Sequence, residues 1–136
     1  MATLTHKGNP VHTIGELPAV GSKAPDFTLI ATDLKPMTLA DFKGKKKILD
    51  ISPSLDTGIC QTAARKFNEA AAGLSNTVVL LVTCDLPFAA KRFCTAENLT
   101  NVEHLSLMSG KEFAKDYGCL LTSGPMKGVC SRCIVV

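Results

Sequence analysis

The chain has 136 residues, of which 46% are hydrophobic, and 15 Lys and Arg against 12 Asp and Glu give it a net charge of +3. This length suits one domain with its own core, and the small charge does not indicate nucleic-acid binding. No stretch reaches the ~18 apolar residues of a membrane span, and residues 1–20 lack the pattern of a secretory signal. We therefore expect one domain over residues 1–136, cytoplasmic, with neither a membrane nor a nucleic-acid partner.

The first half of the chain predicts a hairpin, two strands and a helix. Residues 3–13, interrupted at Gly8-Asn9-Pro10, are typical of an N-terminal β-hairpin. Residues 27–31 and 47–51 predict strands, the second of them largely buried. From about Gly58 to Gly73, apolar residues recur with the 3.6-residue period of a helix, so one face of this helix packs on a sheet.

The next segment predicts the centre of the sheet. Residues 77–83 are uninterrupted, apolar and β-branched, which is typical of a parallel strand covered on both faces. A shorter helix begins near Pro87, because proline suits a first helical turn, and residues 104–108 follow as a strand.

The last part of the chain predicts one more helix and one more strand. Ser109 and Glu112 have the spacing of a capping box, and Gly118 suits the left-handed residue after a helix. Residues 129–136 predict a final strand. This alternation of strands and helices predicts a mixed α/β fold, with a largely parallel central sheet flanked by helices.

Cys60 carries the strongest chemical signal in the sequence. It follows a strand-like run and falls in the first turn of the expected helix, where unpaired N–H groups and the helix dipole lower a thiol pKa. Pro53 forms a rigid corner before it, and the hydroxyl of Thr57 comes three residues before the sulfur. A free cysteine is more often a small buried hydrophobe, but this combination favours a nucleophile.

The other cysteines are open to several readings. A disulfide framework is typical of small secreted domains, so we expect all six to be reduced at rest, with a minority doing redox chemistry. Cys130 and Cys133 form a Cys-x-x-Cys inside an expected strand, where residues three apart point to opposite faces. A zinc site would need two more ligands, and His6, His12 and His104 supply no obvious pair. We expect no metal, flavin or haem cofactor.

The pattern Pro-x-x-x-Thr-x-x-Cys that ends at Cys60 resembles the active-site loop of the peroxiredoxins. Residues 51–60, followed by 65–68, resemble one subfamily, the bacterial thiol peroxidases, although Ser52 stands where a large apolar residue is expected. Three further segments resemble the subfamily's entry strand, resolving-cysteine segment and late active-site strand: residues 21–29, 85–94 and 124–132. The resemblance implies a thioredoxin-like fold with an N-terminal hairpin.

The resemblance also implies a peroxidase that reduces hydrogen peroxide and organic hydroperoxides. Cys60 would be the peroxidatic nucleophile that becomes a sulfenic acid, with Thr57 orienting the sulfur and Pro53 fixing the loop. Arg132 matches an arginine that stabilises the thiolate and the breaking O–O bond. Cys94 matches the resolving cysteine, which gives a Cys60–Cys94 disulfide for thioredoxin to reduce. A homodimer is implied as well.

The chain ends on an apolar run, residues 134–136, whereas members of the resembling subfamily continue through a turn, a strand and a helix. We therefore expect a C-terminally truncated sequence with an exposed sheet edge. Two alternatives to the peroxidase stay open: a non-enzymatic fragment or interaction module, and a thiol-disulfide oxidoreductase using Cys130 and Cys133. Cys130, expected on the same strand face as Arg132, is also a second possible partner for oxidised Cys60.

Overall fold

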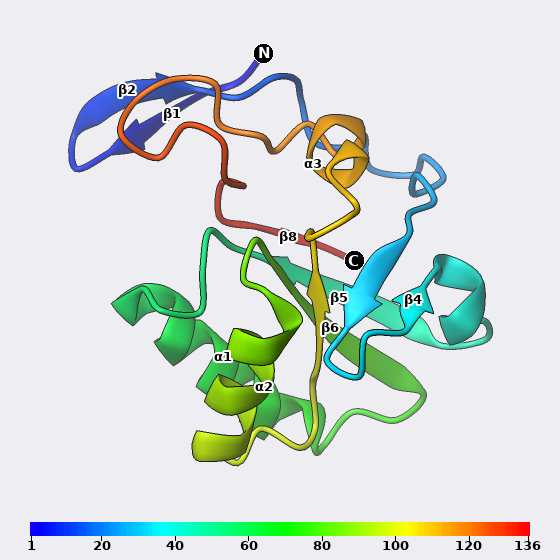
Figure 1. Cartoon of the computed structure of the whole chain (residues 1–136). Helices are drawn as coiled ribbons and strands as arrows, with labels where there is room; N and C mark the ends of the chain where they lie inside the picture. Colours follow the sequence, from blue (N-terminus) through cyan, green and yellow to red (C-terminus); the bar gives the residue numbers. More distant parts are fainter.

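The computed structural model describes residues 1–136, which form a two-stranded hairpin and a six-stranded sheet with helices around it (Figure 1). The hairpin consists of β1 (Thr3–His6) and β2 (Asn9–His12). The strands of the sheet are β3 (Leu29–Ala31), β4 (Pro36–Met37), β5 (Lys46–Ile51), β6 (Thr77–Thr83), β7 (Glu103–Ser106) and β8 (Cys133–Val135). The helices are the 3-10 turn η1 (Leu39–Phe42), α1 (Gly58–Ala71), α2 (Pro87–Ala96) and α3 (Glu112–Asp116). None of them has the length and apolar character needed to cross a membrane.

The centre of the sheet is parallel and its edges are antiparallel. The strand order is β4-β3-β7-β6-β5-β8, and β6 pairs in parallel with β5 and β7. The pairs β3–β4, β3–β7 and β5–β8 are antiparallel. The expectation of a largely parallel sheet is therefore right for the central strands only, because the short outer strands run back along their neighbours.

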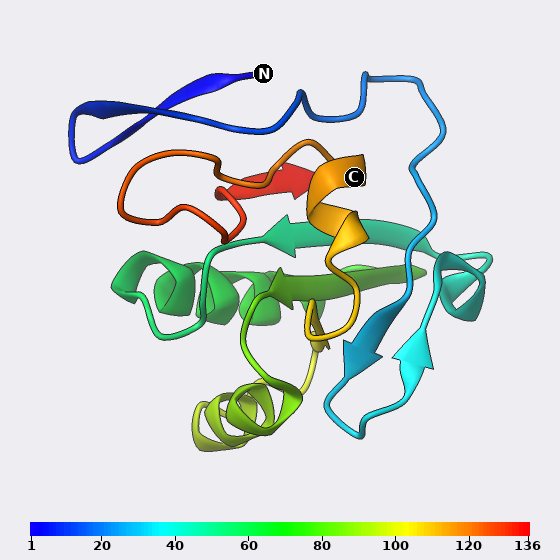
Figure 2. The same cartoon turned by 45° about the horizontal axis from the view of Figure 1, so that its top comes forward.

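Two hydrophobic clusters cover the two faces of this sheet. Helices α1 and α2 lie on one face, with α2 lowest in Figure 2, and pack against Val79 and Leu81 of β6. Helix α3 lies on the other face, where Phe113 packs in one cluster with Leu80 and Val82. Alternate residues of β6 enter opposite clusters, which explains why this strand is apolar throughout.

The last strand is shorter than the sequence predicts. Of the expected strand 129–136, only β8 pairs with the sheet, and Cys130 forms an isolated bridge with Leu120 instead. The N–H of Ser131 donates to the carbonyl of Cys119 at 2.8 Å, which holds this segment away from regular strand geometry. The expectation that Cys130 and Cys133 face opposite sides is therefore wrong, since both contact the same hydrophobic cluster.

The end of α3 agrees with the sequence and its beginning does not. The capping box expected from Ser109 and Glu112 is absent, because the helix begins two residues later than a serine cap requires and Lys111 is its N-cap. Gly118 follows the helix with a φ of 67°, and a Cβ there would collide with the backbone of Glu16. Only glycine tolerates both constraints.

Candidate active site

Helix α1 places Cys60 in its first turn. Thr57 is the N-cap, and the N–H of Gln61 donates to its carbonyl at 2.9 Å. The Cys60 side chain is buried, with only 1% of the residue exposed. The free N–H groups of this turn and the positive end of the helix dipole therefore lie close to a desolvated thiol, where they favour its ionised form.

The sheet brings Arg132 to the same sulfur. β8 pairs with β5 so that Cys133 faces Ile51, and this pairing puts the preceding Arg132 beside the loop that follows β5. Its Nη2 donates a hydrogen bond to Sγ of Cys60 at 3.2 Å. A fixed guanidinium at this distance stabilises a thiolate and any negative charge that develops next to it.

The surroundings of Cys60 lower the pKa of its thiol. Burial opposes ionisation, but donors around the sulfur outweigh it: the side chains of Thr57, Arg132 and Ser52, and the backbone N–H of Ser54. The Thr57 hydroxyl donates its one proton to the carbonyl of Ser54 at 3.0 Å, so it stabilises the thiolate only when it turns toward the sulfur, whereas Arg132 donates directly to the sulfur. Ser52 stands where the family resemblance predicts a large apolar residue, and it adds a polar group to the thiolate site.

Asp85 anchors the loop that precedes α1. Its carboxylate accepts hydrogen bonds from Oγ of Ser54 at 2.6 Å, from the N–H of Leu55 at 2.7 Å and from Oγ1 of Thr83 at 2.7 Å. In the sequence this aspartate belongs only to the segment 85–94 and carries no predicted role of its own. A signal was available, because a polar residue at the carboxyl end of a parallel strand lies beside the loop that follows the neighbouring strand.

A buried histidine, His104, is connected to Asp85 through the hydroxyl of Thr83. Nε2 of His104 lies 2.7 Å from Oγ1 of Thr83, and the Thr83 hydroxyl donates its one proton to Asp85. His104 must therefore donate from Nε2, which leaves Nδ1 as a bare acceptor, and Nδ1 has no partner. Burial lowers the pKa of His104 to about 4, so the imidazole is neutral at neutral pH. These three side chains fix the end of β6.

Asp50 places a buried carboxyl near Arg132. It lies in β5 with 3% of the residue exposed, and burial raises its pKa to about 6 although the charge of Arg132 opposes this. Because Arg132 also donates to Cys60, the carboxylate of Asp50 and the thiolate of Cys60 compete for one guanidinium. The sequence analysis treated Asp50 only as part of a strand.

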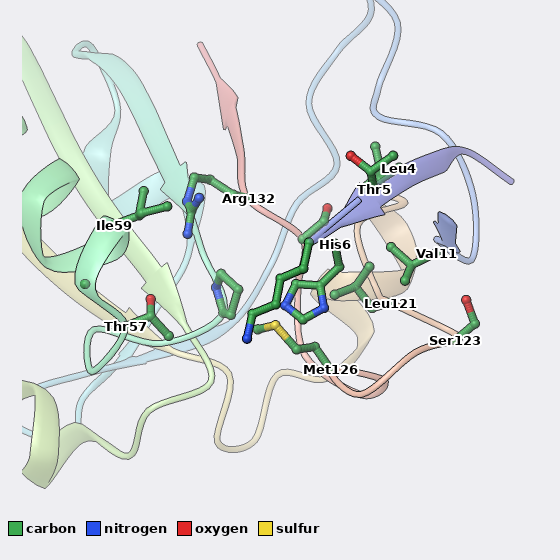
Figure 3. A pocket seen from close by; sticks show the side chains of 14 residues that line it. Leu4, Thr5, His6, Val11, Thr57, Ile59, Leu121, Ser123, Met126 and Arg132 are labelled. Carbon is green, nitrogen blue, oxygen red and sulfur yellow. The ribbon is translucent and has the colours of Figure 1, made fainter. Parts of the chain in front are cut away.

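A cavity of about 780 Å³ opens beside these residues. Its walls come from the hairpin, the start of α1 and the segment 121–132, and they include Pro53. Figure 3 shows Thr57 and Arg132 on one side of the cavity and His6, Leu121 and Met126 on the other. The volume lies within the ~300–1,000 Å³ typical of small-molecule sites, so an organic group fits beside Thr57 and Arg132.

Comparison with known proteins identifies the family. A model of the Redoxin family matches residues 19–136. Over 136 residues, all of this chain and 82% of the relative, the sequence is 46% identical to a thiol peroxidase of Corynebacterium glutamicum. The chain belongs to the thiol peroxidases of the Redoxin family. It is also 54% identical to a thiol peroxidase of Streptococcus pneumoniae over 118 residues, which cover 87% of this chain and 72% of that relative.

A solved structure gives the same assignment. A peroxiredoxin-like protein from Aquifex aeolicus superposes with a TM-score of 0.91 at 37% identity, over 98% of this chain and 78% of that protein. The family and the thioredoxin-like fold that the sequence predicts are thereby confirmed. The sheet flanked by helices and the separate N-terminal hairpin both agree with this assignment.

The structure of this thiol peroxidase gathers four of the five predicted site residues. Pro53, Thr57 and Arg132 line the cavity, and Arg132 also donates to the sulfur of Cys60. Cys94 lies apart from them on α2, half-buried against the cluster between α1, α2 and the sheet, and burial raises the pKa of its thiol. Both Cys60 and Cys94 are free thiols here.

Proposed function

We propose that this thiol peroxidase reduces hydroperoxides at Cys60, and the 3.2 Å hydrogen bond from Arg132 to the sulfur is the observation that carries the proposal. The thiolate attacks the terminal peroxide oxygen, so an S–O bond forms while the O–O bond breaks and water or an alcohol leaves. Arg132 stabilises the thiolate first and then the charge on the leaving oxygen. Thr57 orients the peroxide when its hydroxyl turns from Ser54, and buried Pro53 keeps water from the sulfur.

The cavity supports organic hydroperoxides as substrates beside hydrogen peroxide. Apolar side chains line part of it, among them Leu4, Val11, Leu121 and Met126. Figure 3 shows these four across the cavity from Thr57 and Arg132. A hydroperoxide with an apolar substituent would bury that substituent against the wall while its O–O group meets Cys60.

Cys94 completes the cycle as the resolving cysteine in this proposal. Its thiol attacks the sulfenic acid of Cys60, the S–S bond forms and water leaves. Cys60 and Cys94 belong to two different helices, and the carbonyl of Cys94 accepts the N–H of Leu99 at 2.9 Å. Because the sulfurs must come within about 2 Å of each other, part of α1 or α2 unwinds in each cycle.

Thioredoxin as the reductant, a homodimer and a cytoplasmic location extend the proposal. A dithiol reductant reopens the disulfide by thiol-disulfide exchange, and the family resemblance supports thioredoxin in that role. Exposed apolar side chains near the start of each long helix support a dimer contact: Ile59, Leu86 and Phe88.

Oxidation with one equivalent of hydrogen peroxide tests the proposal. The reduced protein is quenched with an alkylating reagent, and its modified and disulfide-linked peptides are mapped by mass spectrometry. We expect a rapid Cys60–Cys94 disulfide, and none in a Cys60→Ser variant. If Cys60 oxidises no faster than the other five cysteines, the proposal fails.

A further inference from the structure

Four of the six cysteines gather on the sheet face opposite α1 and α2. Cys119 and Cys130 belong to the hydrophobic cluster beneath α3, and Cys84 and Cys133 pack against it. Cys119 and Cys130 are buried, whereas Cys84 and Cys133 are each partly exposed. All four are free thiols, and none is used by the proposed peroxidase cycle.

These thiols lie next to one another in a row, in the order Cys84, Cys130, Cys119, Cys133. Residues 130–131 are held against residues 119–120 by the bridge between Leu120 and Cys130 and by the hydrogen bond from the N–H of Ser131 to the carbonyl of Cys119. The row therefore has a partly exposed thiol at each end and two buried thiols in the middle.

Cys84 is the thiol of this row best placed to react with an oxidant. The thiol and the backbone N–H of Cys130 lower its pKa to about 7, against the effects of burial and of Asp85. The Cys84 thiol therefore ionises more readily than an ordinary cysteine. Partial exposure, a lowered pKa and an adjacent second thiol together characterise cysteines that oxidise reversibly.

Two other readings of the row fit the structure less well. No three His, Cys, Asp or Glu side chains are arranged to hold a metal ion. A dithiol of Cys130 and Cys133 is disfavoured because each of them lies next to Cys119 and neither lies next to the other. The contact between Cys84 and Cys130 remains, and it joins a partly exposed thiol to a buried one.

We propose that Cys84 and Cys130 form a second redox couple, which closes to a disulfide when the protein meets excess hydroperoxide. The Cys84 thiolate attacks the peroxide, so an S–O bond forms, the O–O bond breaks and the leaving oxygen takes a proton. Cys130 then attacks the sulfur of this sulfenic acid, the S–S bond forms, and water leaves with the proton of Cys130. Overall, two thiols and one hydroperoxide give one disulfide, one alcohol or water, and one further water.

This couple adjoins both supports of the Cys60 site. Cys84 directly precedes Asp85, which anchors the loop before α1, and Cys130 lies two residues before Arg132. A disulfide between Cys84 and Cys130 therefore links the segment that holds the loop to the segment that holds the arginine. We expect it to slow the reaction of Cys60 with peroxide, so that excess oxidant lowers turnover.

A full-length Cys60→Ser/Cys94→Ser variant tests the couple without the peroxidase cycle, because only the four clustered thiols remain. The reduced variant is treated with a molar excess of hydrogen peroxide, blocked with N-ethylmaleimide and analysed by intact mass and peptide mapping. We expect the loss of two thiols, a Cys84–Cys130 linked peptide and full reversal by dithiothreitol. A protein that keeps all four thiols, or that forms its disulfide at Cys119, overturns the proposal.

Two single changes in that background serve as matched controls. Cys130→Ala leaves Cys84 without its partner, so oxidation stops at a sulfenic acid that dimedone traps. Cys133→Ala removes a cysteine from the other end of the row and leaves the disulfide intact. The intact mass of the background variant decides the question even if Cys130→Ala fails to fold. Because Cys60 is absent, failure of the couple is distinguishable from failure of the peroxidase proposal.

Discussion

The carboxylate of Asp85 accepts a hydrogen bond from the hydroxyl of Ser54 at 2.6 Å, and this contact joins the end of β6 to the loop that carries Thr57. The same carboxylate also accepts the N–H of Leu55. The peroxidatic site therefore depends on a residue that does not touch the reacting sulfur. Asp85 is a positioning residue for Cys60.

Asp85→Asn is expected to loosen this loop. The amide loses the negative charge that holds two donors of the loop, and hydrogen bonds to charged groups contribute about 1.5–3 kcal/mol each. We expect a loss of unfolding free energy of this order and a rise in the pKa of Cys60, measured by urea unfolding and by the pH dependence of its alkylation. Asp56→Asn, an exposed change in the same loop, is the control. An unchanged Cys60 pKa in Asp85→Asn would contradict a positioning role.

Arg132→Gln is expected to impair the first oxidation of Cys60. The variant loses the charged donor that lies 3.2 Å from the sulfur, and removing one such donor costs roughly 10²–10³-fold in rate. Stopped-flow measurement with hydrogen peroxide checks this, and the pKa of Cys60 rises in the same variant. Lys127→Gln removes an exposed positive charge from the same segment and should leave both quantities unchanged. Equal rates in the two variants would argue against a direct contact.

Asp50→Asn is expected to stabilise the protein at neutral pH and not in acid. The folded protein raises the Asp50 pKa from 3.8 to about 6, so folding favours the protonated carboxyl. Below pH 4 the carboxyl is protonated in both the folded and the unfolded protein, so the unfolding free energy is not reduced. Between pH 4 and 6 the unfolding free energy falls as the pH rises, by on the order of 3 kcal/mol in total. Urea unfolding of parent and variant across this range gives the difference between their unfolding free energies. The contributions of the other titrating groups are common to both proteins and cancel in this difference. A difference independent of pH would sink this assignment.

Leu4→Ser is expected to separate the two kinds of substrate. Leu4 lines the apolar part of the cavity, so its loss weakens contact with the substituent of an organic hydroperoxide, by about 1 kcal/mol or roughly fivefold in kcat/KM. Hydrogen peroxide has no such substituent and should react at an unchanged rate. Steady-state assays with cumene hydroperoxide and hydrogen peroxide test this. Thr3→Ala, on the same strand but outside the cavity lining, is the control.

Sequence reasoning reached the parts of the site that are local in the chain. Pro53, Thr57 and Cys60 lie on one loop and one helix start, so their spacing alone predicts a reactive cysteine. Arg132 came from the family resemblance, because no local pattern connects it with Cys60. The central strand β6 was predicted from its apolar run with its observed bounds.

The residues that the sequence did not reveal act across neighbouring strands. Asp85 meets Ser54 only because β5 and β6 are parallel and end at the same edge of the sheet. Asp50 meets Arg132 only through the antiparallel pairing of β5 with β8. The prediction that Cys130 faces the side opposite to Cys133 was wrong, because an isolated bridge to Leu120 replaces a regular strand at Cys130. Strand register of this kind is set by tertiary packing and has no short-range sequence signal.

The position of Arg132 between Cys60 and Asp50 makes the carboxyl a sensor of the sulfur. When the thiolate becomes a neutral sulfenic acid, the guanidinium loses its negative neighbour and its field acts on Asp50 alone. The carboxyl then ionises more readily and releases a proton that the reduced protein still held near pH 6. Infrared spectra of the carboxyl C=O stretch at that pH therefore follow the oxidation of Cys60 without any label on the protein.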